Sequence, residues 1–310
     1  MAVTVMENGL DKLISDLDSI GAEYSVDLPL APRTSFHIGG NADLGVFPQN
    51  TDEAVAVLRA ADAYGVRHMV LGNGSNVLFD DAGYRGAVIF TKKMRGINAD
   101  GECITADAGA PLGAAAVAAR DAGLSGLEFS YGIPGSVGGA ICMNAGAYGG
   151  EMADVVASVT LYDRENGEVV TVDNAGMHFG YRKSIVGDRF VVLSASMRLP
   201  RGDKNMISEK MNELMRRRTE KQPLNYPSAG SVFKRSAPDV YVGKMIEESG
   251  LKGHTVGGAQ VSLKHAGFIV NRGGATARDV NELIKYIQNK ISEKYGIELE
   301  CEIRRIPERS

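Results

Sequence analysis

Apolar residues recur at helical spacing in several stretches of this chain. The last of these stretches places Val280, Leu283 and Ile287 on one face, and Thr276 with Asp279 forms the capping box that begins a helix. The same spacing, with Asp52 and Glu53 in an acidic first turn, predicts a helix that begins at Thr51. The predicted helices cover residues 5–22, 51–61, 111–122, 207–218, 240–249 and 276–291, and a shorter one covers 140–143.

Short apolar runs between turn residues predict strands. They cover residues 43–48, 68–71, 87–91, 103–106, 155–163, 168–173, 190–199, 267–271 and 298–306. Asn166-Gly167 lies between two of them and predicts a hairpin. Because strands and helices are mixed and at least one hairpin occurs, the pattern favours an α+β fold over a regular βαβ array.

Two glycine-bearing loops interrupt this pattern. Residues 130–151 contain seven glycines, and Gly72-Asn73-Gly74-Ser75-Asn76 follows the short strand at 68–71. Without a Cβ, backbone N–H groups can approach an anion. A turn needed only for close packing, and at Asn73-Gly74 a plain hairpin turn, remain open alternatives. Val77 stands where a dinucleotide fingerprint requires its third glycine, so a Rossmann domain fits poorly.

Composition narrows the class of protein. The 310 residues are 44% hydrophobic and 23% charged with a net charge of −4, so we expect no nucleic-acid partner. No apolar run approaches the ~20 residues of a membrane span, and the acidic first residues do not resemble a secretion signal. The three cysteines, Cys103, Cys142 and Cys301, form neither a metal-binding nor a disulfide spacing. We expect a cytoplasmic protein without membrane contact or bound metal.

Three polar residues could carry chemistry. Arg182, in Gly180-Tyr-Arg-Lys-Ser184, could hold a carboxylate or phosphate bidentately. Ser231 follows Gly230, which leaves room around the hydroxyl, and Glu302 lies in the last predicted strand. From the residues alone, a surface arginine, a turn serine and a solvated glutamate are the more common interpretations and remain open.

Taken together, five segments resemble a known family. They are LGNGSNVLF, EFSYGIPGSVGGAICMNAGAYGGE, FGYRKS, KQPLNYPSAGSVFK and LECEIR, in this order. They are similar to UDP-N-acetylenolpyruvoylglucosamine reductase, the flavin enzyme that makes UDP-N-acetylmuramic acid for bacterial peptidoglycan. The resemblance covers roughly residues 28–307, and the short segment between Arg182 and Ser231 resembles the compact second type of the family.

The resemblance implies a fold and a cofactor. The family has two α+β subdomains that clamp FAD, of the vanillyl-alcohol oxidase-like (PCMH-type) kind, and a smaller α+β substrate domain. We therefore expect FAD-binding subdomains at 1–92 and 93–206, a substrate domain at 207–302 and a tail at 303–310 that returns to the FAD domain. The residues expected to contact FAD are Gly72, Asn73, Gly74, Ser75, Asn76, Gly135, Ser136, Val137, Gly138, Gly139 and Asn144.

The resemblance also implies site residues and a reaction. Arg182, Ser231 and Glu302 match the family's catalytic trio. The residues expected to bind substrate are Tyr181, Lys221 and His265. The implied reaction is the NADPH-dependent reduction of the enolpyruvyl ether of UDP-N-acetylglucosamine through bound FAD. His265 stands where some members have an amide side chain that touches the substrate.

Two other functions remain open at this point. An FAD-linked oxidase of the same fold would act on a small alcohol or sugar and would need neither Ser231 nor Glu302. A nucleotide-sugar-binding protein without chemistry would bind no flavin. We expect the protein to be a monomer.

Overall fold

The computed structural model describes residues 2–235 and 241–307 of the chain. It divides into two compact units, and each takes residues from three stretches of the sequence. The first unit comprises residues 1–27, 43–73 and 85–217, and the second comprises 28–42, 74–84 and 218–310. The four-part division predicted from the family resemblance is not tested by these units and stays a prediction.

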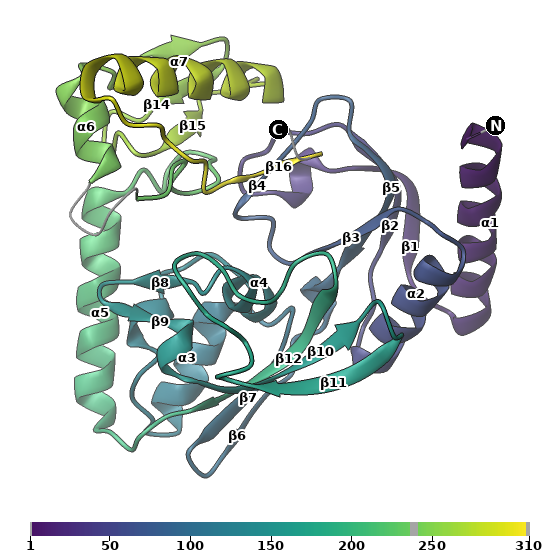
Figure 1. Cartoon of the computed structure of the whole chain (residues 1–310). Helices are drawn as coiled ribbons and strands as arrows, with labels where there is room; N and C mark the ends of the chain where they lie inside the picture. The colour runs from purple at the N-terminus through teal and green to yellow at the C-terminus, as the bar shows by residue number, and fades with distance from the viewer. Residues whose placement is uncertain (1, 236–240, 308–310) are drawn as a thin grey trace. The chain divides into compact units, whose positions relative to one another are not determined.

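A four-stranded sheet lies at one end of the first unit (Figure 1). Its strand order is β1 (Tyr24–Pro29), β2 (Asn41–Val46), β5 (Tyr84–Phe90) and β3 (His68–Leu71), and β3 runs parallel to β5. Helices α1 (Ala2–Ile20) and α2 (Thr51–Ala63) pack against each other and share a core with this sheet. The cap of α2 is Asn50, whose Oδ1 accepts from the Glu53 amide at 2.9 Å.

A five-stranded antiparallel sheet forms the other half of the first unit (Figure 1). Its order is β11 (Glu168–Asp173), β10 (Val156–Asp163), β12 (Phe190–Arg198), β7 (Cys103–Asp107) and β6 (Ile97–Asp100). The predicted hairpin is confirmed as β10 and β11, with Asp163 opposite Glu168. Strand β6 was not predicted, because its residues are mostly exposed and give no apolar pattern.

Two helices belong wholly to this half of the unit, and a third belongs to it as far as Arg217. They are α3 (Leu112–Asp121), α4 (Val137–Cys142) and α5 (Lys204–Lys221). Ala115, Ala116 and Ala119 of α3 are buried, as small side chains packed on a sheet require. Helix α4 begins at Val137, before the predicted start at Ala140, and α5 continues to Lys221, beyond the predicted end at Arg218.

The second unit is smaller and has its own core. Strands β13 (Thr255–Val256), β14 (Ala259–Val261) and β15 (Ile269–Asn271) form an antiparallel sheet beside α6 (Val242–Glu248) and α7 (Ala277–Tyr295). The predicted capping box of α7 is confirmed, and its apolar face is buried. Strand β16 (Arg304–Ile306) pairs in parallel with β4 (Val77–Phe79).

The remaining elements are short. They are β8 (Gly146–Ala147), β9 (Gly150–Glu151) and the single turns η1 (Ala31–Arg33), η2 (Thr91–Lys93), η3 (Glu128–Ser130) and η4 (Met152–Asp154).

The prediction of one strand over 298–306 is wrong for most of its length. Only β16 is a regular strand, although Leu299 and Ile303 are buried in the predicted alternation. The preceding residues pair locally instead: the Glu302 amide donates to Val232 O at 2.7 Å, and the Lys234 amide donates to Glu300 O at 2.9 Å. Alternation reports which side chains are buried, but it does not report whether a continuous partner strand exists. Of the helix predicted over 240–249, Val240 lies outside the described residues.

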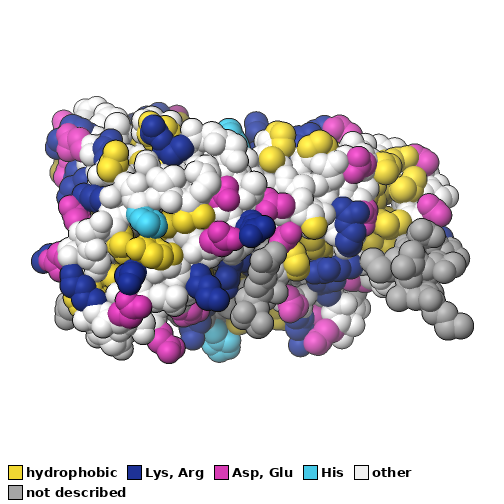
Figure 2. Space-filling view, turned by 90° about the horizontal axis from the view of Figure 1, so that it is seen from above, with side chains coloured by type: hydrophobic (Ala, Val, Ile, Leu, Met, Phe, Trp, Pro, Cys, Tyr) yellow, Lys and Arg dark blue, Asp and Glu magenta, His cyan; other side chains and the backbone are white. Residues whose placement is uncertain are grey.

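Charged side chains of both signs are interspersed over the face shown in Figure 2. Within residues 2–235 and 241–307, no helix is long and apolar enough to cross a membrane.

Candidate functional site

The first glycine loop meets the second inside the first unit. A Cβ built on Gly72 would lie 2.1 Å from Ser136 Oγ and 3.1 Å from Ser136 Cβ. The Asn73 side-chain amide donates to Pro134 O at 3.2 Å. Two segments more than sixty residues apart in the sequence therefore adjoin, and only a glycine fits at position 72.

The residues after Ser136 hold the second loop against the end of β7. The Val137 amide donates to Ala110 O at 2.9 Å, and the Gly138 amide donates to Ala108 O at 2.8 Å. The Gly139 amide donates to Ser136 Oγ at 3.3 Å, so Ser136 caps α4. These three amides are already bonded within the protein, which differs from the expectation that they face a cofactor.

Three other amides of the two loops differ in their hydrogen bonding. In the part of the chain that the structure describes, no hydrogen bond is recorded for the amides of Asn73, Gly135 and Ser136. Gly72, where a side chain would overlap Ser136, and these three amides without a recorded partner are called the cradle. Such a cradle fits an anionic group such as a diphosphate.

The remaining residues of the first loop belong to the second unit. Gly74 has φ +63°, and a Cβ there would lie 2.6 Å from Arg33 O, so this position also requires glycine. The Asn76 side chain donates to Glu302 O at 3.2 Å, and the Arg304 amide donates to Asn76 O at 3.0 Å. Asn76 thus holds the backbone of the segment that carries Glu302.

Ser231 and Glu302 lie on neighbouring segments of the second unit. The Val232 amide donates to Gly267 O at 2.9 Å, and Val232 O accepts from the Glu302 amide at 2.7 Å. Ser231 also forms an antiparallel bridge with Phe268. The residues next to Ser231 therefore hold both the Glu302 segment and the segment that contains His265.

His265 is fixed beside Ser231 by its neighbours. Its Nδ1 accepts from the Gly267 amide at 3.1 Å, and its ring meets the Phe268 ring edge-on. Burial lowers the pKa of the imidazole, and the charges of Lys252 and Lys221 lower it further. A Cβ on Gly267 would lie 3.0 Å from His265 Cε1 and 3.5 Å from Ser231 Oγ, so both side chains approach this position.

The sequence did not single out the charged residues around this imidazole. Lys252 Nζ lies 2.6 Å from Glu247 Oε1, and both charges act on His265. Neither residue belongs to a motif that would have indicated a site. Lys221, which was predicted, ends α5.

Arg182 occupies the tip of a tight turn in the first unit. The Gly180 and Lys183 backbones bond to each other at 3.0 Å and 3.2 Å, with Tyr181 and Arg182 between them. Arg182 has φ +57°, an uncommon conformation for a residue with a side chain. Its Nη2 donates to Gly146 O at 3.3 Å, and its guanidinium lies 5.1 Å from the centre of the Tyr181 ring.

Asn144 is completely buried below this turn. Its Nδ2 donates to Gly180 O at 3.1 Å, and its Oδ1 accepts from the Ala153 amide at 2.9 Å. The side chain, which was expected to line the cofactor, is therefore bonded to the protein backbone at both ends.

The predicted catalytic and substrate-binding residues, together with Asn144, thus form two groups. Tyr181, Arg182 and Asn144 lie together in the first unit, whereas Ser231, Glu302, Lys221 and His265 belong to the second. Among the described residues, no cluster of three or more His, Cys, Asp or Glu side chains could hold a metal ion.

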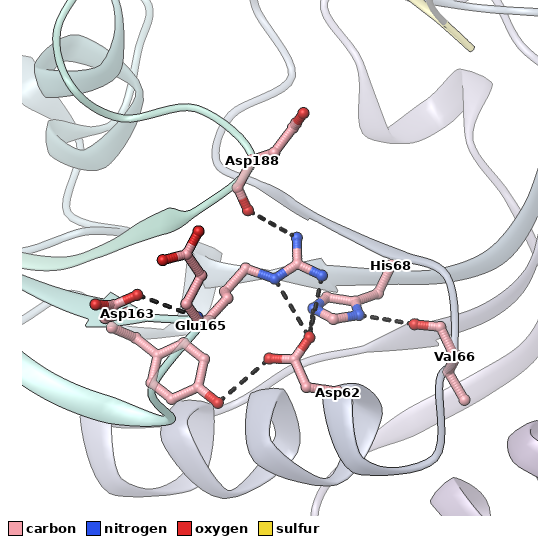
Figure 3. A network of polar contacts seen from close by, with 8 residues as sticks. Asp62, Val66, His68, Asp163, Glu165 and Asp188 are labelled. Carbon is pink, nitrogen blue, oxygen red and sulfur yellow. Dashed lines mark hydrogen bonds and ion pairs between the residues drawn. The ribbon is translucent and has the colours of Figure 1, made fainter.

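A separate, partly buried polar cluster lies between α2 and the β10–β11 hairpin of the first unit (Figure 3). Arg164 bonds to Asp62 Oδ1 at 3.1 Å, and Tyr162 donates to the same carboxylate at 3.3 Å. His68 Nδ1 bonds to Val66 O at 2.9 Å, and its Nε2 lies 3.6 Å from Asp62. Burial lowers the pKa of the His68 imidazole. This cluster is distinct from the two predicted groups.

Comparisons with known proteins match almost the whole chain. The model of an FAD binding domain matches residues 42–173, and that of the UDP-N-acetylenolpyruvoylglucosamine reductase C-terminal domain matches residues 222–306. UDP-N-acetylenolpyruvoylglucosamine reductase of Clostridium perfringens is 45% identical over 91% of this chain and 92% of its own length. The reductase of Caldicellulosiruptor bescii is 48% identical over 94% of this chain and 93% of its own length.

Solved structures agree with these matches. The crystal structure of the reductase from Thermus caldophilus aligns with a TM-score of 0.78 and 34% identity, over 92% of this chain and 98% of that one. Glucooligosaccharide oxidase from Acremonium strictum aligns with a TM-score of 0.51 and 15% identity over 91% of this chain and 59% of that one, which shows a shared fold alone.

Proposed function

This chain belongs to the UDP-N-acetylenolpyruvoylglucosamine reductase family, and we propose that it reduces the enolpyruvyl ether of UDP-N-acetylglucosamine to UDP-N-acetylmuramate. It is an FAD-dependent oxidoreductase of peptidoglycan precursor synthesis, and its FAD-binding domain is α+β. The length of 310 residues fits the compact type of the family. The single observation that carries the proposal is the high identity over more than nine-tenths of both chains.

The residues of the first unit fit a bound dinucleotide. The cradle at Gly72, Asn73, Gly135 and Ser136 would receive the diphosphate of FAD, since its amides have no recorded protein partner among the described residues. When bound, FAD accepts a hydride from NADPH and later supplies one to the ether. The protein contributes binding, orientation and the electrostatic field.

Arg182 would stabilise the charge that develops on the substrate. Hydride addition to the terminal carbon of the enolpyruvyl group moves negative charge toward its carboxylate. A guanidinium held near that carboxylate is worth roughly 3–4 kcal/mol of transition-state stabilisation. The turn and the contact with Gly146 O restrict the guanidinium before the substrate arrives, which reduces the cost of reorganisation.

Ser231 would protonate the adjacent carbon, and Glu302 would orient the substrate carboxylate. A serine hydroxyl is a weak acid, so it suits only a strongly basic carbanion or enolate. The positive charge of Lys221, which acts on His265, would also stabilise the serine alkoxide. Burial lowers the pKa of His265, and because its Nδ1 accepts from the Gly267 amide, its Nε2 would donate a hydrogen bond to the substrate.

We further propose a cytoplasmic monomer that uses NADPH and the ether as its two substrates. The alternative of an FAD-linked oxidase rests only on the shared fold with the sugar oxidase. The presence of Ser231 and Glu302 on adjoining segments favours the reductase, because an oxidase would need neither residue.

An anaerobic absorbance experiment tests the proposal. The spectrum of the purified holoprotein should bleach with NADPH and return when the enolpyruvyl ether of UDP-N-acetylglucosamine is added without oxygen. A flavin spectrum that returns only with oxygen would support the oxidase instead. A protein that cannot be reconstituted with FAD would contradict both.

A further inference from the structure

Four of the six described non-glycine residues with positive φ lie in two neighbouring segments of the first unit. They are Asn144 and Tyr148 in one segment, and His178 and Arg182 in the other, with φ values of +39°, +57°, +45° and +57°. Each such conformation is unfavourable and persists only where surrounding contacts hold it. The contacts that hold the second segment are therefore informative about function.

Asn144 supplies the central contact between these segments. Its Nδ2 donates to the carbonyl of Gly180, which is the first residue of the turn that presents Arg182. Two residues further along the chain, Gly146 O accepts from Arg182 Nη2. The Asn144 segment thus holds both the base of the turn and the guanidinium at its tip.

The other end of the Asn144 side chain is fixed as well. Its Oδ1 accepts from the amide of Ala153 in η4, and the residue has no exposed surface. Both ends of the carboxamide are used, so the orientation of the group is determined. An aspartate in the same place would keep the acceptor for Ala153 and would put an oxygen against Gly180 O, 3.1 Å away.

We propose that Asn144 is a positioning residue for Arg182 in the reaction with the enolpyruvyl ether, and not a direct ligand of the flavin. This inference rests on the proposed function for its kinetic consequence. Asn144 acts through the backbone of Gly180, and it sets where the guanidinium stands relative to the substrate carboxylate. A displacement of about 1 Å in such a group can reduce a rate by about 100-fold.

Asn174 provides a matched control. Its Nδ2 donates to Ala153 O at 2.9 Å and to Val156 O at 2.7 Å, so it also bonds to η4 from a half-buried position. It makes no recorded contact with Gly180 or Arg182. Asn174→Ala removes two hydrogen bonds from the same region without touching the turn.

The kinetic test uses the FAD-loaded protein and a double-mutant cycle. We expect Asn144→Asp to slow reoxidation by the ether by about 10- to 100-fold and to change flavin reduction by NADPH less than about threefold. In an Arg182→Ala background the same change should slow reoxidation less than about threefold, because the residue through which it acts is gone. Equal losses in both backgrounds, an equal loss with Asn174→Ala, or no loss at all would overturn the proposal.

A second measurement does not depend on the reaction. Trypsin cleaves after Arg182 and Lys183, and the rate of cleavage in the native holoprotein reports how firmly the turn is held. Asn144→Asp should accelerate cleavage at these two bonds at least about fivefold, whereas Asn174→Ala should leave it near the wild-type rate. Unchanged cleavage in Asn144→Asp would contradict the positioning role, even if the ether proved not to be the substrate. If the ether failed to reoxidise the wild-type protein, that result would contradict only the proposed function.

Discussion

Gly72 and Ser136 are so close that a side chain on Gly72 would overlap the serine, with its Cβ 2.1 Å from Ser136 Oγ. The hydroxyl cannot rotate away freely, because it accepts the Gly139 amide and caps α4. The contact joins the loop after β3 to the loop before α4. A tight glycine at the meeting point of two loops is what a backbone cradle for a diphosphate requires.

Gly72→Ala should therefore weaken FAD binding. To relieve the overlap, Ser136 must move. The move breaks the hydrogen bond by which Ser136 caps α4, at a cost of about 1 kcal/mol or more. If that cost falls on the cradle, the dissociation constant for FAD should rise about fivefold or more. Titration of the apoprotein with FAD, followed by flavin fluorescence, measures the change.

Gly187→Ala is the control for this substitution. Gly187 lies in the same unit, and a Cβ there would meet no atom within 4 Å. This variant should bind FAD as the wild type does. Wild-type affinity in Gly72→Ala would show that the two loops do not form the cradle.

Ser231→Ala should separate the two half-reactions. If the hydroxyl donates a proton to the substrate, flavin reduction by NADPH should stay within about twofold of the wild type. Reoxidation by the ether should fall by about 100-fold or more, since general acid catalysis contributes about that much. Stopped-flow absorbance of the flavin in each half-reaction gives both rates, and an equal fall in both would contradict the assignment of Ser231 as proton donor.

Local sequence signals were sufficient to predict the longer helices and the hairpin. The buried face and capping box of α7 follow from residues within a few positions of one another, and the β10–β11 hairpin follows from its own turn. The alternation near Glu302 also identified which side chains are buried. It could not show that β16 pairs with β4, a strand more than two hundred residues earlier in the chain.

The site was predictable from motifs only in part. Motifs identified the two glycine loops and the residues Arg182, Ser231 and Glu302, but not the partners that hold them. The bonds of Asn144 to Gly180 O and to the Ala153 amide depend on backbone groups, which carry no sequence identity. Lys252 approaches His265 only because the second unit folds as it does.

Gly267→Ala tests the approach of Ser231 and His265. The added methyl group would lie 3.0 Å from His265 Cε1 and 3.5 Å from Ser231 Oγ, so the imidazole must shift. The backbone of Gly267 needs no positive φ, so an alanine is compatible with the local conformation. We expect turnover of the ether to fall about tenfold or more, with flavin reduction by NADPH in the same protein as the internal control.

His265→Gln is the companion variant for this prediction. A glutamine amide can still donate a hydrogen bond where the imidazole Nε2 stands, so this variant should retain more activity than His265→Ala. If His265→Gln, His265→Ala and Gly267→Ala all turned over the ether at the wild-type rate, the imidazole would have no part in binding the substrate.

The pH dependence of stability should reveal the lowered pKa of the His68 imidazole. Burial lowers the pKa of this imidazole in the folded protein below the value of 6.5 of an ordinary histidine. Below pH 6.5 the unfolded chain therefore binds a proton that the folded chain does not, and the free energy of unfolding falls as the pH falls. The loss begins near pH 6.5 and continues until the pH reaches the folded pKa, at up to about 1.4 kcal/mol per pH unit.

His68→Gln should reduce this dependence. Urea denaturation followed by circular dichroism at pH 8, 7, 6 and 5 would give the slope for both proteins. Between pH 8 and 7 the two slopes should agree, and between pH 6.5 and 5 the variant should lose less stability than the wild type. The Asp163 carboxyl does not interfere in this window, because its pKa is lowered below 3.8 by the bond to Arg189. The same slope in both proteins between pH 6.5 and 5 would show that the buried imidazole near Asp62 takes up its proton as easily as one in the unfolded chain.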